Sequence, residues 1–325
     1  MWKRLGMALF TMVVSLIIVF IVIQSMPGDP VDILAQEIVR AEALPYDVAY
    51  QRAIATLNYD PSQPLHERFV EYVAGIVSGD LGYSLAYKKP VTEIVGGALP
   101  WTMLILSVSL LLSFTVGVLI GIYVAWKRKR ALNVAVTAYQ SIFGSIPDYI
   151  VAYILVFIFA VSLGILPSKG AYSSSVTVGF NAPFIADVIR HAILPVMAYF
   201  ITTVASWTVA MKANSLTVLG EDYMTYAEVR GLHRRRILVH YLGRNAMLPM
   251  VTSLAVSFGL MFGGSPLIEN LFLYPGVGYY LSIAISRRDF PLMQGMFLII
   301  IVMVVLSSLL AEFLYQILNP RLRGA

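Results

Sequence analysis

The sequence has 325 residues, of which 58% are hydrophobic and only 13% are charged. Soluble domains are usually about a quarter charged, so this composition predicts a protein whose surroundings are largely lipid. The absence of cysteine excludes disulfides, thiolate metal sites and cysteine nucleophiles, and the distribution of the net charge of +5 favours membrane topology over nucleic-acid binding.

Six segments are apolar and long enough to cross a bilayer, which takes about 20 residues. Five of them are 5–26, 99–126, 192–211, 247–268 and 292–311. The sixth is a long element, 131–166, which Pro147 must break or kink, so that its second half, 147–166, completes the crossing. We therefore predict an all-α polytopic membrane protein with six transmembrane helices.

The first apolar segment has two interpretations. Residues 1–4 resemble the charged start of a cleaved signal peptide, but the 22 apolar residues that follow are long for one. No small-x-small cleavage site precedes the sequence PGDP at 27–30. These features favour an uncleaved membrane anchor, residues 1–26.

Lysine and arginine predict the orientation of the spans, because they accumulate on the cytoplasmic side. Of the 23 Lys and Arg residues, 14 fall in four candidate inner segments: 1–4, 127–130, 212–244 and 321–323. Residues 27–98 instead hold five basic and ten acidic side chains. Both termini are therefore expected in the cytoplasm and residues 27–98 outside.

The segment 27–98 is long enough for a small subdomain. Apolar residues recur at helical spacing in 65–77, and residues 31–57 also have a helical pattern that Pro45 interrupts. Loop signals follow at 79–84 and 88–90. The pattern predicts a helical extracytoplasmic subdomain.

A short helix is predicted soon after the 192–211 span. Glu221 and Asp222 stand at its first turn, where the helix dipole favours acids, and Arg230 stands at the opposite end. Gly231 then suits a left-handed C-terminal cap. A helix of under three turns is marginal on its own, so residues 222–230 need a surface to pack against.

The next segment, 234–246, has apolar side chains on one side and arginines on the other, which predicts an amphipathic helix along the inner membrane surface. Pro249 is expected in the first turn of the following span, where a proline costs no hydrogen bond. Arginine-rich inner loops also follow from the positive-inside rule and can bind anionic headgroups, so charge alone does not decide what this loop does.

The stretch EDYMTYAEVRGLHRRRILVHYLGRNAMLP, residues 221–249, resembles the EAA loop of ABC importer permeases of the oligopeptide/dipeptide/nickel class. The matching positions are Asp222-Tyr223, Ala227, Gly231-Leu232, Arg244-Asn245-Ala246 and Leu248-Pro249, and the spacing of 18 from Gly231 to Pro249 matches as well. Tyr226, Glu228 and Val229 depart from the pattern, because small or basic residues are commoner there.

Further motifs extend this resemblance, in colinear order, over nearly the whole chain. They are PGDP at 27–30, SGDLGYSL at 78–85, GSIPDYI at 144–150, HAILP at 191–195, GGSPLIENLFLYPGVG at 263–278, RDFPLMQG at 288–295 and LNPRLR at 318–323. They are similar to the first of the two permeases in such systems, the one with the large outer loop.

The resemblance implies the type I ABC importer permease fold, with a core of five transmembrane helices in 99–325 and a cytoplasmic coupling loop at 220–249. The residues that it implies for docking an ATPase are Glu221, Asp222, Tyr223, Tyr226, Ala227, Glu228, Arg230 and Gly231, with Arg244, Asn245 and Pro249 shaping the loop. The implied partners are a second permease, two ATPase subunits, an external substrate-binding protein and the lipid bilayer, but no nucleic acid.

No catalytic or metal site is expected in this chain. It has no G-x-x-x-x-G-K-[ST] phosphate loop, and its four histidines lack the spacing of a zinc helix. ATP and Mg²⁺ are therefore expected on partner subunits. A stand-alone secondary transporter would show chains of intramembrane charges, but only Asp148 and Glu312 qualify, and an intramembrane enzyme would need a paired acid or nucleophile.

Two acidic residues are candidates for the pathway or its gate. Asp148 either begins a helix or faces the translocation path, because an acid inside a membrane segment is a functional hypothesis. Glu269 either lies near the mouth of the path or braces the turn at Pro275 and Gly276. The neighbouring sequence Arg287-Arg288-Asp289 reads as a solvated ion-pair cluster.

The substrate is the least determined feature. The class that the sequence resembles carries di- and oligopeptides, and some members carry oligosaccharides such as cello-oligosaccharides or β-glucans. Six tyrosines in 27–98, at positions 46, 50, 59, 72, 83 and 87, could stack on sugars. Tyrosine is also common at membrane surfaces, so we place peptides ahead of oligosaccharides.

Overall fold

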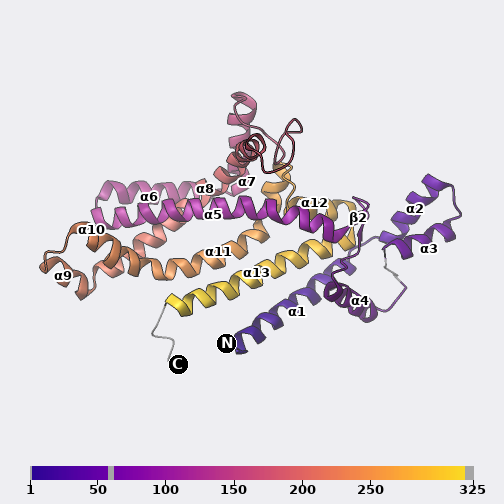
Figure 1. Cartoon of the computed structure of the whole chain (residues 1–325), viewed down its shortest axis with the longest axis horizontal. Helices are drawn as coiled ribbons and strands as arrows, with labels where there is room; N and C mark the ends of the chain where they lie inside the picture. The colour runs from indigo at the N-terminus through magenta and orange to yellow at the C-terminus, as the bar shows by residue number, and fades with distance from the viewer. Residues whose placement is uncertain (1, 58–61, 319–325) are drawn as a thin grey trace. The chain divides into compact units, whose positions relative to one another are not determined.

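The computed structural model describes residues 2–57 and 62–318 (Figure 1). Tyr59, the basic segment 321–323 and most of the LNPRLR motif lie outside the described residues. Of the described residues, those in regular structure are almost all helical.

The first part of the chain forms four helices and a small strand pair. The helices are α1 (Trp2–Gln24), α2 (Pro30–Glu42), α3 (Tyr46–Leu57) and α4 (Leu65–Ser78). Strands β1 (Tyr83–Ser84) and β2 (Lys89–Pro90) pair antiparallel, with Tyr83 opposite Pro90. The helical patterns that we identified in 31–57 and 65–77 are confirmed, with Pro45 lying in the break between α2 and α3.

The longer helices follow in order. They are α5 (Val91–Lys127), α6 (Arg130–Phe143), α7 (Asp148–Leu155), the π-helix η1 (Val156–Ser162), α8 (Ala182–Leu219), α9 (Asp222–Val229), α10 (Arg234–Arg236), the π-helix η2 (Ile237–Gly243), α11 (Arg244–Leu271), α12 (Val277–Arg287) and α13 (Phe290–Leu318).

Five helical stretches among the described residues are long and apolar enough to cross a membrane. They are Leu5–Gln24, Val91–Lys127, Ala182–Leu219, Arg234–Gly263 and Phe290–Ile317. The pair Arg130–Phe143 and Asp148–Ser162, bent by 91°, makes a sixth if it counts as one span. The prediction of an all-α polytopic membrane protein is confirmed, and the predicted break is found where Pro147 precedes the first residue of α7.

The span boundaries are less well predicted than the spans. α5 begins at Val91 rather than at 99, and α8 covers Ala182–Leu219 rather than 192–211. The helices continue beyond the apolar stretches because backbone hydrogen bonds close within the helix whatever the side chains are. α5 passes through residue 98 without a break, and the division at residues 26 and 98 stays a prediction.

One compact unit consists of Met1–Thr102, Phe262–Asn270 and Tyr274–Val305. One apolar core of this unit joins the end of α1, the start of α5, α12 and the start of α13, and its most buried members include Ile23, Val91, Ala284 and Met296. A second core with fewer buried residues, built largely of alanine and valine, joins α2 to α3. Asp29 caps α2 by accepting a hydrogen bond from Val31 N at 2.8 Å.

The other unit consists of Met103–Met261, Leu271–Leu273 and Leu306–Ala325. Gly117 and Gly121 of α5 lie directly against α8, because an added Cβ would come within 2.5 Å of Trp207 Cβ and 2.7 Å of Met211 Cβ, respectively. Two small residues one turn apart let two helix backbones approach closely in a membrane protein. α6 lies alongside α8 (Figure 1), and the Tyr139 hydroxyl donates to the Ile201 carbonyl at 2.9 Å.

Candidate functional site

The loop between α8 and α11 contains the predicted short helix, α9, and we call residues 220–249 the α9 loop. α9 begins at Asp222, directly after Glu221, whose carbonyl accepts from Met224 N at 3.0 Å. It ends at Val229, one residue before the predicted end. The acidic first turn and the position of the helix are as the sequence predicted.

The end of α9 forms a Schellman motif around Gly231. Gly231 has φ +66° and donates from its backbone N–H to the Glu228 carbonyl at 2.9 Å. Leu232 N donates to the Ala227 carbonyl at 3.3 Å, which completes the pair of bonds that defines the motif. The left-handed conformation favours glycine, so the predicted cap is confirmed and its reason is backbone conformation.

α9 packs on an apolar cluster that the α9 loop forms with the ends of α5 and α8. The buried members of this cluster are Met224, Ala227, Ile237 and Leu242. Trp126 of α5 and Leu219 of α8 pack against them. The guanidinium of Arg234 lies 5.3 Å from the centre of the Trp126 ring, within the range of a cation–π contact. This cluster provides the packing surface that stabilises a helix of eight residues, which would be marginal alone.

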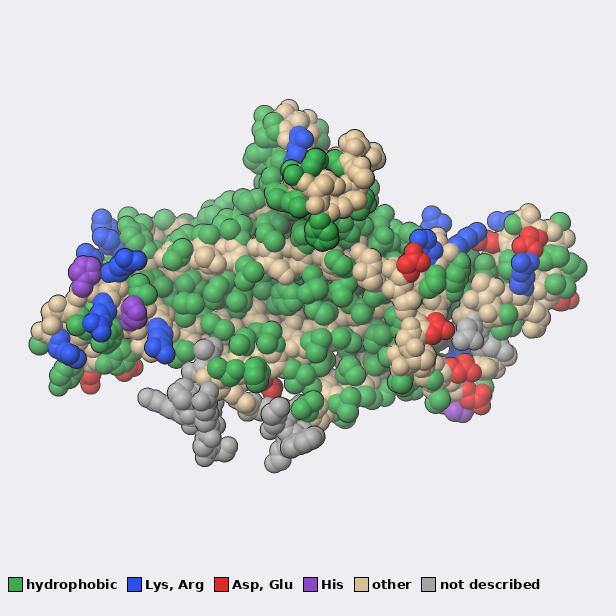
Figure 2. Space-filling model, in the orientation of Figure 1, with side chains coloured by type: hydrophobic (Ala, Val, Ile, Leu, Met, Phe, Trp, Pro, Cys, Tyr) green, Lys and Arg blue, Asp and Glu red, His purple; other side chains and the backbone are tan. Residues whose placement is uncertain are grey.

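The opposite side of α9 is exposed. Tyr226 and Val229 are 71% and 82% exposed, and Tyr223 is 38% exposed. The charged residues of α9 and its ends, Glu221, Asp222, Glu228 and Arg230, are exposed as well. Figure 2 shows Lys, Arg and His side chains gathered over α9, α10 and the start of α6, with a few acidic side chains among them. Of the predicted docking residues, only Ala227 is buried.

The return to α11 corrects the predicted position of Pro249. α10, η2 and α11 follow one another without a gap from Arg234, so Pro249 is the sixth residue of α11 and not in the first turn of a new helix. The seven-residue π-helix η2 carries the chain from the predicted amphipathic segment directly into the span. A proline inside a helix leaves the carbonyl four residues earlier without its usual backbone donor, and membrane helices tolerate this where neighbouring groups or local π-type adjustments satisfy that carbonyl.

The other two residues predicted to shape the loop stand at the start of α11. Arg244 is its first residue and is exposed. Asn245 donates from Nδ2 to the Tyr241 carbonyl at 2.7 Å, a bond to the preceding turn of η2. Gly243, just before them, is buried against the Leu238 carbonyl, where an added Cβ would come within 3.1 Å.

Asp148 is the first residue of α7, next to the 91° bend. Its Oδ1 accepts from the backbone N–H of Tyr149 at 2.8 Å, and its side chain is half-buried. This geometry agrees with the helix-start alternative.

Glu269 is almost fully buried, at 1% exposure, in the unit that contains α12. Its Oε1 accepts from the Thr102 hydroxyl at 2.7 Å, and its Oε2 accepts from Gly278 N at 2.7 Å and Tyr279 N at 3.2 Å. The same Thr102 oxygen accepts from Val277 N at 2.8 Å. The carboxylate thus satisfies the first N–H groups of α12, where the helix dipole favours negative charge. This is the brace alternative for Glu269.

Asp289 corrects the expectation of a solvated ion-pair cluster at Arg287-Arg288-Asp289. The Asp289 side chain is fully buried and accepts from the Ser84 hydroxyl at 2.5 Å, Ala86 N at 2.9 Å and Leu292 N at 3.1 Å. Arg288 packs over Gly28. Asp289 therefore holds the β1–β2 segment against the start of α13, and no sequence pattern indicates a hydrogen-bond partner 205 residues away.

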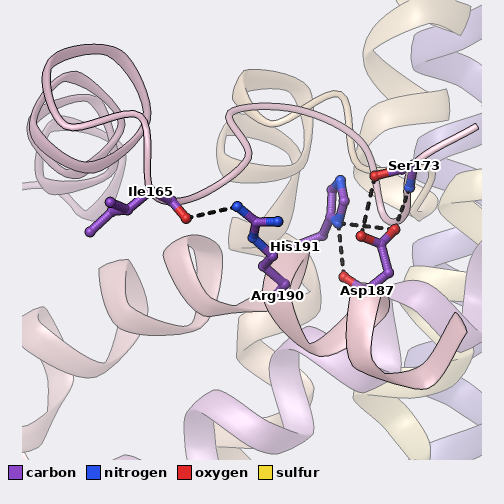
Figure 3. Close-up of polar contacts among 5 residues, drawn as sticks. All are labelled: Ile165, Ser173, Asp187, Arg190 and His191. Atoms are coloured by element: carbon purple, nitrogen blue, oxygen red, sulfur yellow. Dashed lines mark hydrogen bonds and ion pairs between the residues drawn. The ribbon is translucent and has the colours of Figure 1, made fainter. Parts of the chain in front are cut away.

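The segment between η1 and α8 is held by the polar cluster in Figure 3. Asp187 accepts from Ser173 N at 2.5 Å and from the Ser173 hydroxyl at 3.2 Å, and His191 Nδ1 lies 2.8 Å from the Asp187 carbonyl. Arg190 donates to the Ile165 carbonyl at 3.0 Å. These bonds tie the loop to the first turns of α8. Within residues 2–57 and 62–318, no group of three or more His, Asp or Glu residues could hold a metal ion.

Sequence reasoning missed Trp126 as part of the candidate site. Trp126 lies about a hundred residues before α9, at the end of an apolar span, where an aromatic residue is common anyway. Together with Met224, Thr225 and Glu228 it lines a cavity of about 260 Å³ that Arg128 also borders. The cation–π contact with Arg234 connects two basic segments that looked independent in the sequence.

Comparison with known proteins places residues 117–324 in a match to the family described as "Binding-protein-dependent transport system inner membrane component". The chain is 30% identical to the dipeptide transport system permease protein DppB of Escherichia coli K12, covering 99% of this chain and 97% of the relative. It is 29% identical to the oligopeptide transport system permease protein AppB of Bacillus subtilis, covering 94% and 93%. It is 28% identical to the glutathione transport system permease protein GsiC of Salmonella typhimurium, covering 99% and 97%.

Proposed function

The chain belongs to the family of binding-protein-dependent transport system inner membrane components, and on this premise we propose that it is one permease subunit of an ATP-driven peptide importer. The observation that carries the proposal is the α9 loop. The family match covers this loop entirely, and α9 presents an exposed face while its other face is fixed to the ends of α5 and α8.

In the proposed mechanism α9 is the helix that docks into a cytoplasmic ATPase. Tyr226 and Val229 would enter a groove of the ATPase, with Glu221, Asp222, Tyr223, Glu228 and Arg230 around them. The Schellman motif at Gly231 keeps α9 rigid, and the contacts of Met224 and Ala227 join it to Trp126 and Leu219. Closure of two ATPases on ATP would therefore displace the ends of α5 and α8 and not merely a loose loop.

The proposed complex has this chain, a second permease, two ATPases and an external substrate-binding protein. ATP-driven closure would open the pathway between the two permeases outward, and release after hydrolysis would open it inward. This chain would make no bonds in the reaction; ATP and Mg²⁺ would be held by the ATPases. We place both termini and the α9 loop in the cytoplasm and residues 27–98 outside, on the distribution of Lys and Arg.

Peptides are the proposed substrates, because the relatives named above transport dipeptides, oligopeptides or glutathione. One feature favours oligosaccharides as the second candidate. Tyr46 and Tyr50 lie with ring centroids 5.8 Å apart and border an open groove of about 460 Å³ together with Asp29, Asp32 and Asp47. Both hydroxyls donate to these carboxylates, Tyr46 to Asp32 at 2.6 Å and Tyr50 to Asp29 at 3.2 Å. These bonds hold both rings at the groove, where the ring of Tyr46, which is 46% exposed, is available for stacking.

The test is reconstitution of the chain with its partner subunits in proteoliposomes. We expect uptake of di- or oligopeptides that requires ATP, the ATPases and the binding protein, and no uptake of cello-oligosaccharides. Uptake of the sugars alone would select the second candidate. Uptake by this chain without any ATPase would overturn the importer assignment in favour of a secondary transporter.

A further inference from the structure

α4 has two apolar faces, and only one of them packs within its unit. Phe69 and Tyr72 lie against Phe20 of α1, with ring centroids 5.2 Å and 5.6 Å apart. A second stripe, at the spacing of one helix face, is exposed: Val70 is 65%, Val73 37% and Val77 84% exposed. Because α4 packs at the Gln24 end of a membrane-spanning helix, an exposed apolar stripe there suits the boundary between headgroups and hydrocarbon.

A cavity of about 480 Å³ lies beside this helix. It is bordered by α4, the Gln24 end of α1, the segment 78–82 and the start of α13. Its apolar wall includes Phe20, Leu57 and Leu81, and its polar groups include Arg68, Glu71, Tyr72 and Asp80. The cavity is therefore lined both by a cation and by carboxylates.

Two of the polar groups are held in place for a ligand. Arg68 donates from Nη1 to Gln24 Oε1 at 2.8 Å, which fixes the guanidinium at the cavity wall. The hydroxyl of Tyr72 is buried and has no hydrogen-bond partner among the described residues. A buried hydroxyl without a hydrogen-bond partner destabilises the protein, so a ligand that forms a hydrogen bond with it would remove this cost and bind more tightly.

The cavity also contains two carboxylates, Glu71 and Asp80, which can accept hydrogen bonds from a cationic group. Glu71 Oε1 accepts from Gln63 at 3.4 Å, and Asp80 Oδ1 accepts from Gly82 N at 2.9 Å. Each carboxylate offers about four acceptor positions, so one such bond leaves acceptor capacity for an ammonium group. Arg68 and Glu71 are three residues apart on α4, so their side chains are neighbours on its surface. A ligand that satisfies the cavity therefore bears an anionic oxygen group and an N–H-donating cation a few atoms apart.

We propose that this cavity binds the headgroup of an ethanolamine phospholipid. The phosphate lies at Arg68 and Tyr72, and the ammonium lies at Glu71 and Asp80. The acyl chains lie along the exposed side chains of α1, among them Val13, Ile17 and Ile21. A choline headgroup has no N–H to donate, and a glycerol headgroup has no cation, so both fit less well. The site rests on the placement of residues 27–98 at the membrane surface and not on any transport step.

The test measures lipid retention by the transporter assembled with its partner subunits. The complex is purified in mild detergent and titrated with ethanolamine, choline and glycerol phospholipids of identical acyl chains, and bound lipid is counted by native mass spectrometry. We expect the ethanolamine lipid to bind about tenfold more tightly than the choline lipid, the effect of one charge-assisted hydrogen bond. Equal binding of all three lipids would overturn the proposal.

Matched variants locate the lipid. Glu71→Gln is expected to remove most of the preference for ethanolamine, whereas Glu67→Gln, an exposed glutamate one turn earlier that does not line the cavity, leaves it unchanged. Arg68→Gln lowers retention of the ethanolamine lipid, and Ala74→Phe fills the cavity from its wall without removing a polar group. An unchanged preference for ethanolamine in Glu71→Gln together with unchanged retention in Ala74→Phe would overturn the site even if Arg68→Gln proves unstable.

A further arm separates the lipid from a zwitterionic peptide, which also carries an ammonium and a carboxylate. Addition of a dipeptide at millimolar concentration is expected to leave the bound ethanolamine lipid in place. Displacement of the lipid by the dipeptide would overturn the proposal in favour of a peptide site. Because retention is measured without transport, a failed transport assay would not be mistaken for failure of this site.

Discussion

The α9 loop and the junction around Glu269 and Asp289 use charged side chains in opposite ways. At the junction two carboxylates are buried and accept six hydrogen bonds among the contacts described, from Thr102, Ser84 and backbone N–H groups of residues such as Gly278. On α9 the charged side chains are exposed and the buried contacts are apolar. At the junction the polar groups form hydrogen bonds with one another, whereas the charged groups of the α9 loop remain exposed to a partner. Substitutions should therefore affect folding at the first and coupling at the second.

The largest effect on stability is expected for Glu269→Ala. Removing the carboxylate leaves the Thr102 hydroxyl and the N–H groups of Gly278 and Tyr279 buried without this acceptor, which costs about 3 kcal/mol. The midpoint of thermal unfolding of the purified protein measures the loss. Glu93→Ala is the control, because Glu93 is exposed and its pair with Lys89 contributes at most about 1 kcal/mol. An unchanged midpoint together with lost transport would make Glu269 a pathway group instead.

Asp289→Asn is expected to cost about 2 kcal/mol at neutral pH, because the amide cannot accept from both sides. Burial, the largest cause, raises the pKa of the Asp289 carboxyl above its ordinary value, although hydrogen bonds from Ala86, Ser84 and Leu292 lower it in part. The folded protein thus binds this proton more readily than the unfolded chain, and the stability that the carboxyl contributes increases as pH falls through the raised pKa toward the ordinary value.

The corresponding measurement compares the two proteins as a function of pH. Lowering the pH from 7.5 to 5 should increase the thermal midpoint of the wild type relative to that of Asp289→Asn. A difference that stays constant with pH, or that shrinks, would show that Asp289 does not titrate as its burial requires. Glu93→Gln, at an exposed residue that pairs with Lys89, serves as the control for general effects of acid.

Gly231→Ala is expected to cost about 1 kcal/mol, because alanine at φ +66° is strained although the space around it is open. Gly231→Asn should restore most of this loss, since asparagine tolerates the left-handed region. The more sensitive measurement is ATPase activity stimulated by substrate in the assembled transporter, which we expect to fall in Gly231→Ala and recover in Gly231→Asn. Equal activity in both variants and the wild type would count against a rigid α9.

The smallest effect on stability, within about 0.5 kcal/mol, is expected for Tyr226→Ala and Val229→Ala, because both side chains are exposed. Their effect on coupling should nevertheless be large, a roughly tenfold loss of substrate-stimulated ATPase activity, if they fill a groove of the ATPase. Val178→Ala, at a valine that is 63% exposed in the segment before α8, is the matched control. Normal coupling in both α9 variants would place the docking surface elsewhere.

Local signals in the sequence predicted α9 well. Its acidic first turn and its glycine cap are determined by residues within the helix or next to it, so Asp222 and Gly231 could be assigned without tertiary structure. Pro249 was misplaced because the sequence does not reveal that η2 continues the helix through 237–243. A π-helix has no side-chain pattern of its own that would separate it from an α-helix ending.

Contacts between distant residues could not be predicted. Asp289 follows two arginines and therefore reads as a surface ion pair, yet its partners Ser84 and Ala86 belong to a segment two hundred residues earlier. Trp126 likewise stands at the end of one of several spans, and nothing in the sequence indicates that it packs against α9. For Glu269 the sequence offered a brace and a gate, and only the position of Thr102 and the α12 N–H groups distinguishes the geometry of a brace.

The contact of α5 with α8 at Gly117 and Gly121 has a consequence for genetics. A side chain at either position would meet backbone atoms, such as the Val204 carbonyl at 2.9 Å or the Thr208 carbonyl at 2.7 Å. Backbone atoms cannot be exchanged by mutation, so a smaller residue on α8 would not relieve the clash. Selection for revertants of Gly117→Val or Gly121→Val should therefore return the glycine or another small residue at the same codon, and intragenic suppressors on α8 should be rare.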